Sequence, residues 1–259
     1  MVKKRITQHT QSERRVAGGR AITLTFRADD GPSAASPIPT VLRLPDATGP
    51  VPAALLLHGY ASRKEDMAES AGDALMPLGV ASLSIDLPLH GERADPFELR
   101  SVRNPFEVAA RWRTAIDEAQ LALRLLGARS DIDRDRLALI GYSLGSYLSL
   151  AVVERDRAPR AVVLAAGGDL PDFPFAALIR SVADPMRGVR ALAGRPLLMV
   201  HGRRDRTILP AQAERLFAAA PEPKEIQWWD AGHYLPDAAV KKAAEWVASM
   251  LALGPAGIR

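Results

Sequence analysis

The sequence has no cysteine, few aromatic residues and no long hydrophobic run. Because none of its 259 residues is Cys, a disulfide framework, a Cys-ligated zinc site, an iron–sulfur cluster and a cysteine nucleophile are all excluded. Aromatic residues make up 5% of the chain, and no apolar stretch approaches the roughly 18 residues that a membrane-spanning helix needs. Hydrophobic residues at 47% and charged residues at 25% are instead typical of a globular chain.

An excess of charge of one sign is confined to the start of the chain. Residues 1–20 contain six basic side chains and one acidic side chain, so they carry a net charge of +5, and residues 21–259 sum to −1. No helical pattern has the dense basic face of a nucleic-acid-binding protein, and we predict no such partner. We expect residues 1–20 to be a basic N-terminal extension, either a flexible, solvated terminus or a weak contact for anionic surfaces.

The charged start is not followed by the apolar run of about 7–15 residues that defines a signal peptide. Together with the absence of cysteine, this favours a cytoplasmic protein. A chain of 259 residues also fits a single α/β domain, which often reaches about 250 residues. We therefore expect residues 21–259 to form one domain.

Short apolar runs alternate with longer helical patterns after residue 50. Such near-continuous runs are typical of strands that are buried on both faces of a parallel sheet. The runs are Ala53–Leu57, Val80–Ile85, Leu137–Ile140, Ala161–Ala165 and Leu197–Val200. Two further segments, Ala21–Arg27 and Val41–Leu44, resemble an antiparallel hairpin, and Glu225–Trp229 predicts the last strand.

Three sequence patterns mark the beginnings of helices. Ser62-Arg63-Lys64-Glu65 has the form of a capping box. Asn104-Pro105 offers an N-cap followed by proline at the first helical position, and Asp237 caps a later apolar stripe. Alternating strands and helices predict a wound α/β sheet, in which ligands bind at the carboxyl ends of the strands. Residues 87–104 and 167–195 lack a clear strand and are the candidate lid and pocket-wall segments.

The segment Gly141-Tyr142-Ser143-Leu144-Gly145 lies between an apolar run and a helical pattern. A Gly-x-Ser-x-Gly in that position forms a sharp strand-to-helix turn, which exposes the serine hydroxyl at the edge of the sheet. The glycines let neighbouring backbone approach where a Cβ would clash. Ser143 is therefore the candidate nucleophile, and the alternative is a tight turn whose serine is only hydrogen-bonded.

A serine nucleophile needs a base, and the chain has five histidines. His58, His90 and His201 each precede a glycine, which favours turn histidines bonded to backbone, and His9 lies in the basic N-terminal segment. His233 instead follows the last expected strand, on a loop at the same edge of the sheet as the serine. It is the candidate base.

The acid that orients the base should lie on another loop at that edge. Asp205 follows the run that ends at Val200 and is the candidate, with Asp169 as the alternative. Asp86 also ends a strand, but it precedes the serine in the chain. The order Ser143, Asp205, His233 is the Ser–Asp–His order of α/β-hydrolases.

Five motifs of the chain occur together in one known family. They are Leu57-His58-Gly59-Tyr60, Asp86-Leu87-Pro88-Leu89-His90-Gly91, Gly141-Tyr142-Ser143-Leu144-Gly145, His201-Gly202-Arg203-Arg204-Asp205 and Gly232-His233. The sequence resembles the α/β-hydrolase-fold serine hydrolases, and most of all the compact branch of dienelactone hydrolase-like proteins and small bacterial esterases. Dienelactone hydrolase itself uses a cysteine nucleophile, which this chain lacks. Ser146 also stands where the family often has a second glycine.

The resemblance implies a mostly parallel, twisted sheet of about eight strands flanked by helices, with at most a small lid. It also implies an oxyanion hole formed by the backbone N–H groups of Tyr60 and Leu144, which would stabilise the charge on a tetrahedral intermediate. The predicted activity is that of a serine carboxylesterase for small soluble acyl esters, with Ser143, Asp205 and His233 as catalytic residues and no metal or organic cofactor. A related peptidase, thioesterase or lactonase is an alternative, and so is a non-catalytic ligand-binding protein with this fold.

Two groups of side chains bear on the choice of substrate. The first lies in the expected lid and either lines an acyl pocket or packs against the sheet: Phe173, Pro174, Phe175, Leu178 and Ile179. The second flanks the expected acid and either attracts anionic substrates or is solvated at the surface: Arg203, Arg204 and Arg206.

Overall fold

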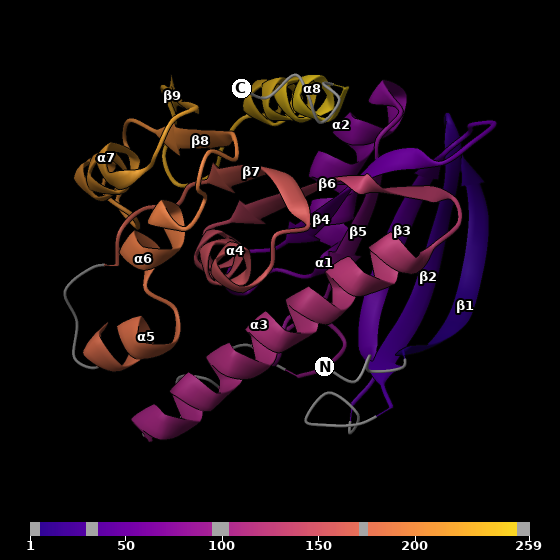
Figure 1. Ribbon diagram of the computed structural model, residues 1–259, viewed down its shortest axis with the longest axis horizontal. Coiled ribbons are helices and arrows are strands. Elements are labelled where there is room, and N and C mark those ends of the chain that lie inside the picture. The colour runs from indigo at the N-terminus through magenta and orange to yellow at the C-terminus, as the bar shows by residue number, and fades with distance from the viewer. Residues whose placement is uncertain (1–5, 30–35, 95–103, 171–175, 253–259) are drawn as a thin grey trace.

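The computed structural model describes residues 6–29, 36–94, 104–170 and 176–252, and in these ranges nine strands form one sheet (Figure 1). The strand order is β1-β2-β3-β5-β4-β6-β7-β8-β9. Three antiparallel strands begin the sheet: β1 (Ile6–Val16), β2 (Gly19–Ala28) and β3 (Ile38–Pro45). The parallel strands are β4 (Val51–Leu57), β5 (Ala81–Ile85), β6 (Ile132–Tyr142), β7 (Pro159–Ala165), β8 (Leu197–Gly202) and β9 (Lys224–Trp229). The mostly parallel α/β sheet predicted from the sequence is confirmed, with nine strands where about eight are expected.

The central strands are buried on both faces, as their unbroken apolar runs predict. In β4, Leu55 and Leu57 belong to the core cluster on one face, and Ala54 and Leu56 belong to the cluster on the other face. All four side chains are 0% exposed. The hairpin predicted from the alternating segments near the start of the chain is also present, as β2 and β3.

Helices cover both faces of the sheet (Figure 1). One face carries α3 (Pro105–Ala128), α4 (Leu144–Arg155), α5 (Ala176–Val182), α6 (Pro185–Arg190) and α7 (Pro210–Ala219). The other carries α1 (Lys64–Met67), η2 (Ala68–Gly72), α2 (Asp73–Leu75), η3 (Met76–Leu78) and α8 (Asp237–Ala252). No helix in the described part of the chain is long and apolar enough to cross a membrane.

Residues 6–16 form β1 at the edge of the sheet, so this part of the basic N-terminal segment is an ordered strand and not the flexible terminus that is one of the two expectations for it. This strand pairs with β2 along its whole length, with a bulge between Thr10 and Ser12. Its side chains are exposed at every position from residue 7 to residue 15, so the strand has no apolar alternation by which it could be recognised. Polar and charged side chains of this kind also protect an edge strand from pairing with another chain.

Two of the predicted helix starts have different outcomes. The side chain of Asn104 accepts a hydrogen bond from the N–H of Phe106 at 3.0 Å and caps α3, as predicted. The predicted capping box at Ser62 is wrong by one residue. The carboxylate that accepts from the Ser62 hydroxyl and from the N–H of Arg63 belongs to Asp66, at 2.7 and 3.2 Å, and not to Glu65.

Candidate active site

Ser143 lies at the junction of β6 and α4, in backbone geometry that few residues other than glycine adopt. Its φ is 51° and its ψ is −110°, and such a conformation costs on the order of 1–3 kcal/mol unless the surroundings enforce it. Here the N–H of Ser143 donates to the carbonyl oxygen of Ala165 at 2.9 Å. A Cβ on Gly145 would overlap the carbonyl oxygen of Leu57. The strained strand-to-helix turn predicted from the Gly-x-Ser-x-Gly motif is therefore present.

Ser146, which replaces the second glycine of the family pattern, strengthens this turn. Its hydroxyl donates to the carbonyl oxygen of Ser143 at 2.6 Å, and its N–H donates to the same oxygen at 2.9 Å. The side chain fits because Gly167 faces it, where a Cβ would overlap the Oγ of Ser146. The departure from the family pattern thus adds a hydrogen bond beside the candidate nucleophile.

The imidazole of His233 lies between the hydroxyl of Ser143 and the carboxylate of Asp205. Its Nε2 is 2.9 Å from Oγ of Ser143, and its Nδ1 is 2.8 Å from Oδ2 of Asp205. Oδ1 of Asp205 accepts the N–H groups of Thr207 and Ile208 at 2.8 and 3.0 Å. Because both of its oxygens are held, the carboxylate fixes the ring and favours the tautomer with hydrogen on Nδ1. The structure brings the three residues selected from the sequence together.

The loops that carry Asp205 and His233 are joined by backbone hydrogen bonds. The N–H of Arg203 donates to the carbonyl oxygen of Trp229 at 2.8 Å, and the N–H of Arg204 donates to that of Ala231 at 2.9 Å. These bonds continue the pairing of β8 with β9 beyond the ends of the strands. The two loops therefore form one unit that holds the candidate acid and the candidate base in register.

The two other aspartates considered from the sequence lie away from His233. Asp169 pairs with Arg180 at 3.0 Å and accepts the N–H of Leu170 at 2.8 Å. Asp86 is fully buried in a separate pair with Lys64. Of the candidates considered, Asp205 is the one whose carboxylate the structure places against His233.

The loop after β4 passes beside the nucleophile turn. A Cβ on Gly59 would lie 2.9 Å from Cδ1 of Tyr142 and 3.4 Å from Cβ of Ser143. Tyr60 follows directly, and Leu144 is the first residue of α4, where backbone N–H groups have no partner within a helix. Both residues expected to form the oxyanion hole thus belong to segments that border Ser143.

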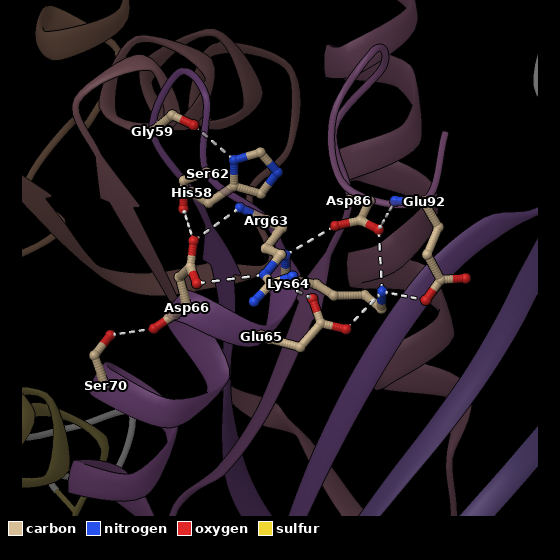
Figure 2. Close-up of polar contacts among 10 residues, drawn as sticks. All are labelled: His58, Gly59, Ser62, Arg63, Lys64, Glu65, Asp66, Ser70, Asp86 and Glu92. Carbon is tan, nitrogen blue, oxygen red and sulfur yellow. Dashed lines mark hydrogen bonds and ion pairs between the residues drawn. The ribbon is translucent and has the colours of Figure 1, made fainter. Parts of the chain in front are cut away.

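A buried ion cluster anchors the far end of this loop (Figure 2). The ammonium group of Lys64 lies 3.1 Å from Asp86, 2.6 Å from Glu92 and 2.8 Å from Glu65, although the lysine side chain is only 1% exposed. Asp86 also accepts the backbone N–H groups of Lys64 and Glu92 at 2.8 and 3.0 Å. Burial acts to lower the pKa of Lys64, but the hydrogen bonds to the carboxylates outweigh it and raise the pKa above its ordinary value. Sequence reasoning missed this cluster, since nothing local distinguishes Lys64 from a lysine on the surface of a helix.

His58 connects the same loop to the end of β5. Its Nε2 accepts the N–H of Leu87 at 3.1 Å, and its Nδ1 donates to the carbonyl oxygen of Gly59 at 2.7 Å. The ring packs against that of His90, with 5.1 Å between centroids. Burial lowers the pKa of His58 to about 4. The histidine is therefore the neutral, backbone-bonded residue expected from the His-Gly motif.

Of the side chains considered as substrate contacts, the two that the structure describes, Leu178 and Ile179, do not line the cavity beside Ser143. Phe173, Pro174 and Phe175 lie outside the described residues. Leu178 packs against the main core, and Ile179 is buried in a small cluster with Tyr147, Leu170 and Ile208, so these two pack against the body of the protein. A cavity of about 490 Å³ does border Ser143, but its walls come from the loop after β4, from η2 and α8, and from the strands β6, β7 and β8.

The three arginines near Asp205 are exposed and do not line that cavity. The guanidinium of Arg203 lies over the ring of Trp228, and Arg204 pairs with Asp230 at 3.0 Å. Of the two interpretations considered, the structure favours surface residues. Among the described residues, no group of three or more His, Cys, Asp or Glu side chains is arranged to hold a metal ion.

A mostly parallel sheet with a serine on a strand-to-helix turn, and with an aspartate and a histidine on loops after two later strands, defines an α/β-hydrolase arrangement. Residues 54–247 match the model of the alpha/beta hydrolase family. The chain belongs to that family.

The relatives include hydrolases and esterases. An uncharacterized protein of Mycobacterium tuberculosis is 30% identical over 184 residues, which are 68% of this chain and 60% of that protein. Esterase EstD of Thermotoga maritima is 28% identical over 137 residues, which are 49% of this chain and 30% of the esterase. The chain thus spans less than two thirds of the length of these curated relatives.

Solved structures show the same fold over nearly the whole chain. TT1662 of Thermus thermophilus superposes with a TM-score of 0.69 at 25% identity, over 83% of this chain and 94% of that one. Acetyl xylan esterase 1 of a Thermoanaerobacterium species gives a TM-score of 0.71 at 19% identity, over 96% of this chain and 89% of the esterase.

Proposed function

We propose that the protein is a serine carboxylesterase that cleaves small soluble acyl esters through an acyl-enzyme. The observation that carries the proposal is the position of the His233 ring, 2.9 Å from the Ser143 hydroxyl and 2.8 Å from the Asp205 carboxylate. A serine hydroxyl is a weak nucleophile until a base removes its proton, and a base oriented by a third group meets that need.

In the proposed reaction, Oγ of Ser143 attacks the ester carbonyl carbon while Nε2 of His233 takes the hydroxyl proton. Asp205 accepts the hydrogen bond from Nδ1 and stabilises the imidazolium that forms. The backbone N–H groups of Tyr60 and Leu144 donate hydrogen bonds to the negatively charged oxygen of the tetrahedral intermediate. His233 then gives the proton to the departing alcohol. In the second half of the reaction, a water molecule attacks the acyl-enzyme while His233 takes a proton from it, and His233 returns that proton to Oγ of Ser143 as the acid departs.

A fluorophosphonate probe tests the nucleophile directly, because it labels an activated serine covalently. We expect the wild type to be labelled and Ser143→Ala to be unlabelled. Ser149→Ala is the matched control, since this serine lies on the next turn of α4 with its hydroxyl bonded to the carbonyl oxygen of Gly145, and it should keep the label. A folded wild type that resists the probe would show that the protein is a non-catalytic binder.

A panel of an ester, a thioester and an amide with the same acetyl group, together with a small lactone, tests the reaction class. The proposal expects the p-nitrophenyl ester to be hydrolysed fastest. Faster turnover of the amide or the thioester would replace the carboxylesterase by a peptidase or a thioesterase.

A further inference from the structure

The cavity that begins at Ser143 extends away from the edge of the sheet into the layer between the sheet and α8. At one end it is bordered by Ser143, His233 and Tyr60, and further in by Ile140 and Val163. These last two side chains belong to the core cluster on the α8 face. The space is therefore continuous with the candidate active site and reaches inward along the strands. Its volume of about 490 Å³ lies within the range of about 300–1,000 Å³ typical of small-molecule sites.

The walls of the inner part are apolar. The strands contribute Ile140, Val163 and Val200, and α8 contributes Val240 and Ala243. A charged or strongly polar group placed among these side chains would lose its hydrogen bonds to water without replacement.

Two polar residues that border the cavity, Asp66 and Ser70, already have partners within the protein (Figure 2). The Asp66 carboxylate accepts from the hydroxyl of Ser62 at 2.7 Å and from the N–H of Arg63 at 3.2 Å. The hydroxyl of Ser70 donates to the carbonyl oxygen of Asp66 at 2.7 Å. Both Asp66 and Ser70 are exposed, so they mark the outer rim and do not call for a polar ligand inside.

Short side chains on the helices create this space. Ala239, Ala243 and Ala244 of α8 and Ala71 of η2 face the cavity, and all four are buried. Protein interiors are normally packed to the density of organic crystals, so a row of alanines opposite branched strand residues leaves a gap that larger side chains would fill.

We propose that this cavity, which we call the α8 pocket, binds an unbranched alkyl chain of the ester substrate. The inference rests on the proposed carboxylesterase function and narrows its substrate class from small acyl esters to esters with a medium-length apolar chain. Burial of one methylene raises the binding constant about threefold to fourfold. We therefore expect kcat/KM to rise with each added carbon until the α8 pocket is full.

Two ester series test the proposal and show which half of the ester occupies the α8 pocket. In the first, the p-nitrophenyl group is constant and the acyl group runs through acetate, butyrate, hexanoate and octanoate. In the second, the acetyl group is constant and the alcohol is lengthened in the same steps. We expect kcat/KM to rise at least tenfold from the shortest to the longest member of one series. A flat or falling profile in both series would overturn the proposal.

Ala243→Leu fills the α8 pocket and should abolish most of the rise while acetate is still hydrolysed. Ala238→Leu is the matched control, because this alanine is exposed on the same helix and does not line the cavity, and it should keep the full rise. Val240→Phe is a second filling variant at a half-buried position, for use if Ala243→Leu does not fold. An unchanged profile in a folded filling variant would place the alkyl chain elsewhere and overturn the proposal.

Failure of the proposed function has a different signature. In that case the wild type would hydrolyse no member of either series and would not react with the fluorophosphonate probe. Normal hydrolysis of the acetate with no preference for longer chains would instead overturn only the role of the α8 pocket.

Discussion

The hydroxyl of Tyr142 donates a hydrogen bond to the backbone carbonyl oxygen of His233, at 2.7 Å. Tyr142 is the residue directly before the candidate nucleophile, so this bond ties the nucleophile turn to the loop of the candidate base. Burial raises the pKa of the phenol above its ordinary value, and the group therefore stays a neutral donor throughout the working range of a histidine base. Nothing in the Gly-x-Ser-x-Gly motif indicates this role, because the position of Tyr142 accepts any residue.

Tyr142→Phe removes this bond and leaves the half-buried carbonyl oxygen of His233 without its donor. We expect the free energy of unfolding to fall by about 1–2 kcal/mol and kcat for p-nitrophenyl acetate to fall severalfold, because the imidazole is less well placed. Chemical denaturation and steady-state kinetics measure the two effects. Tyr147→Phe is the control, since the hydroxyl of Tyr147 makes only a long contact of 3.5 Å with the carbonyl oxygen of Asp169. Equal effects in the two variants would contradict the role of Tyr142.

Gly167→Ala should destabilise the protein because the new methyl group overlaps Oγ of Ser146. Overpacking of this kind costs about 1–3 kcal/mol. The same alanine should cost much less when combined with Ser146→Gly, which removes the obstructing side chain. A double-mutant cycle of unfolding free energies measures this coupling. Additive effects of the two substitutions would show that the backbone, and not the side chain of Ser146, prevents a larger residue at position 167.

Lys64→Met should lower the free energy of unfolding by about 3–5 kcal/mol, because it leaves the buried carboxylate of Asp86 without its cation. The loop that ends at Lys64 also borders Ser143, so kcat should fall as well. Lys241→Met is the matched control on an exposed face of α8. Urea denaturation of both variants is the measurement, and a loss below about 1 kcal/mol, as for a surface ion pair, would contradict the structural role of the cluster.

Acidification should weaken the fold through His58. Its pKa is lowered from 6.5 to about 4 by burial, so between these values the unfolded chain binds a proton at this residue and the folded chain does not. Above the pKa of the unfolded state, His58 does not reduce the free energy of unfolding. As the pH falls through this window, the free energy of unfolding decreases by up to about 3 kcal/mol. His58→Gln should reduce the loss measured between pH 7 and pH 5. A variant with the same pH dependence as the wild type would rule out His58 as a source of acid sensitivity.

The sequence was sufficient for those parts of the fold and site that local patterns encode. The runs that became β4 to β8 are apolar because both faces of those strands are covered, and Ser143 is marked by the glycines that its turn requires. Asp205 is indicated because it follows a strand at the correct edge, but Asp169 also follows a strand, and the sequence does not show which of the two loops lies beside His233.

Other features depend on contacts between distant segments. β1 is exposed from residue 7 to residue 15 and is defined by its pairing with β2. An exposed polar sequence does not reveal this pairing. The Lys64–Asp86 pair joins residues 22 positions apart, and the bond from Tyr142 to His233 joins residues 91 apart. The α8 pocket likewise exists only because alanines of α8 and η2 are brought against the sheet. None of these partners can be chosen from the sequence alone, because many other charged, aromatic or small residues lie at equivalent local positions.

The separation between Ser143 and His233 has a consequence for the synthesis of the protein. The two residues are 90 positions apart, and the histidine comes from the loop after the last strand. A ribosome adding about 5–20 residues per second therefore exposes the serine roughly 5–20 s before it can release the histidine. During that interval the nascent chain carries the proposed nucleophile without its proposed base, so the proposed enzyme cannot acylate itself on cellular esters until β9 and α8 have been made.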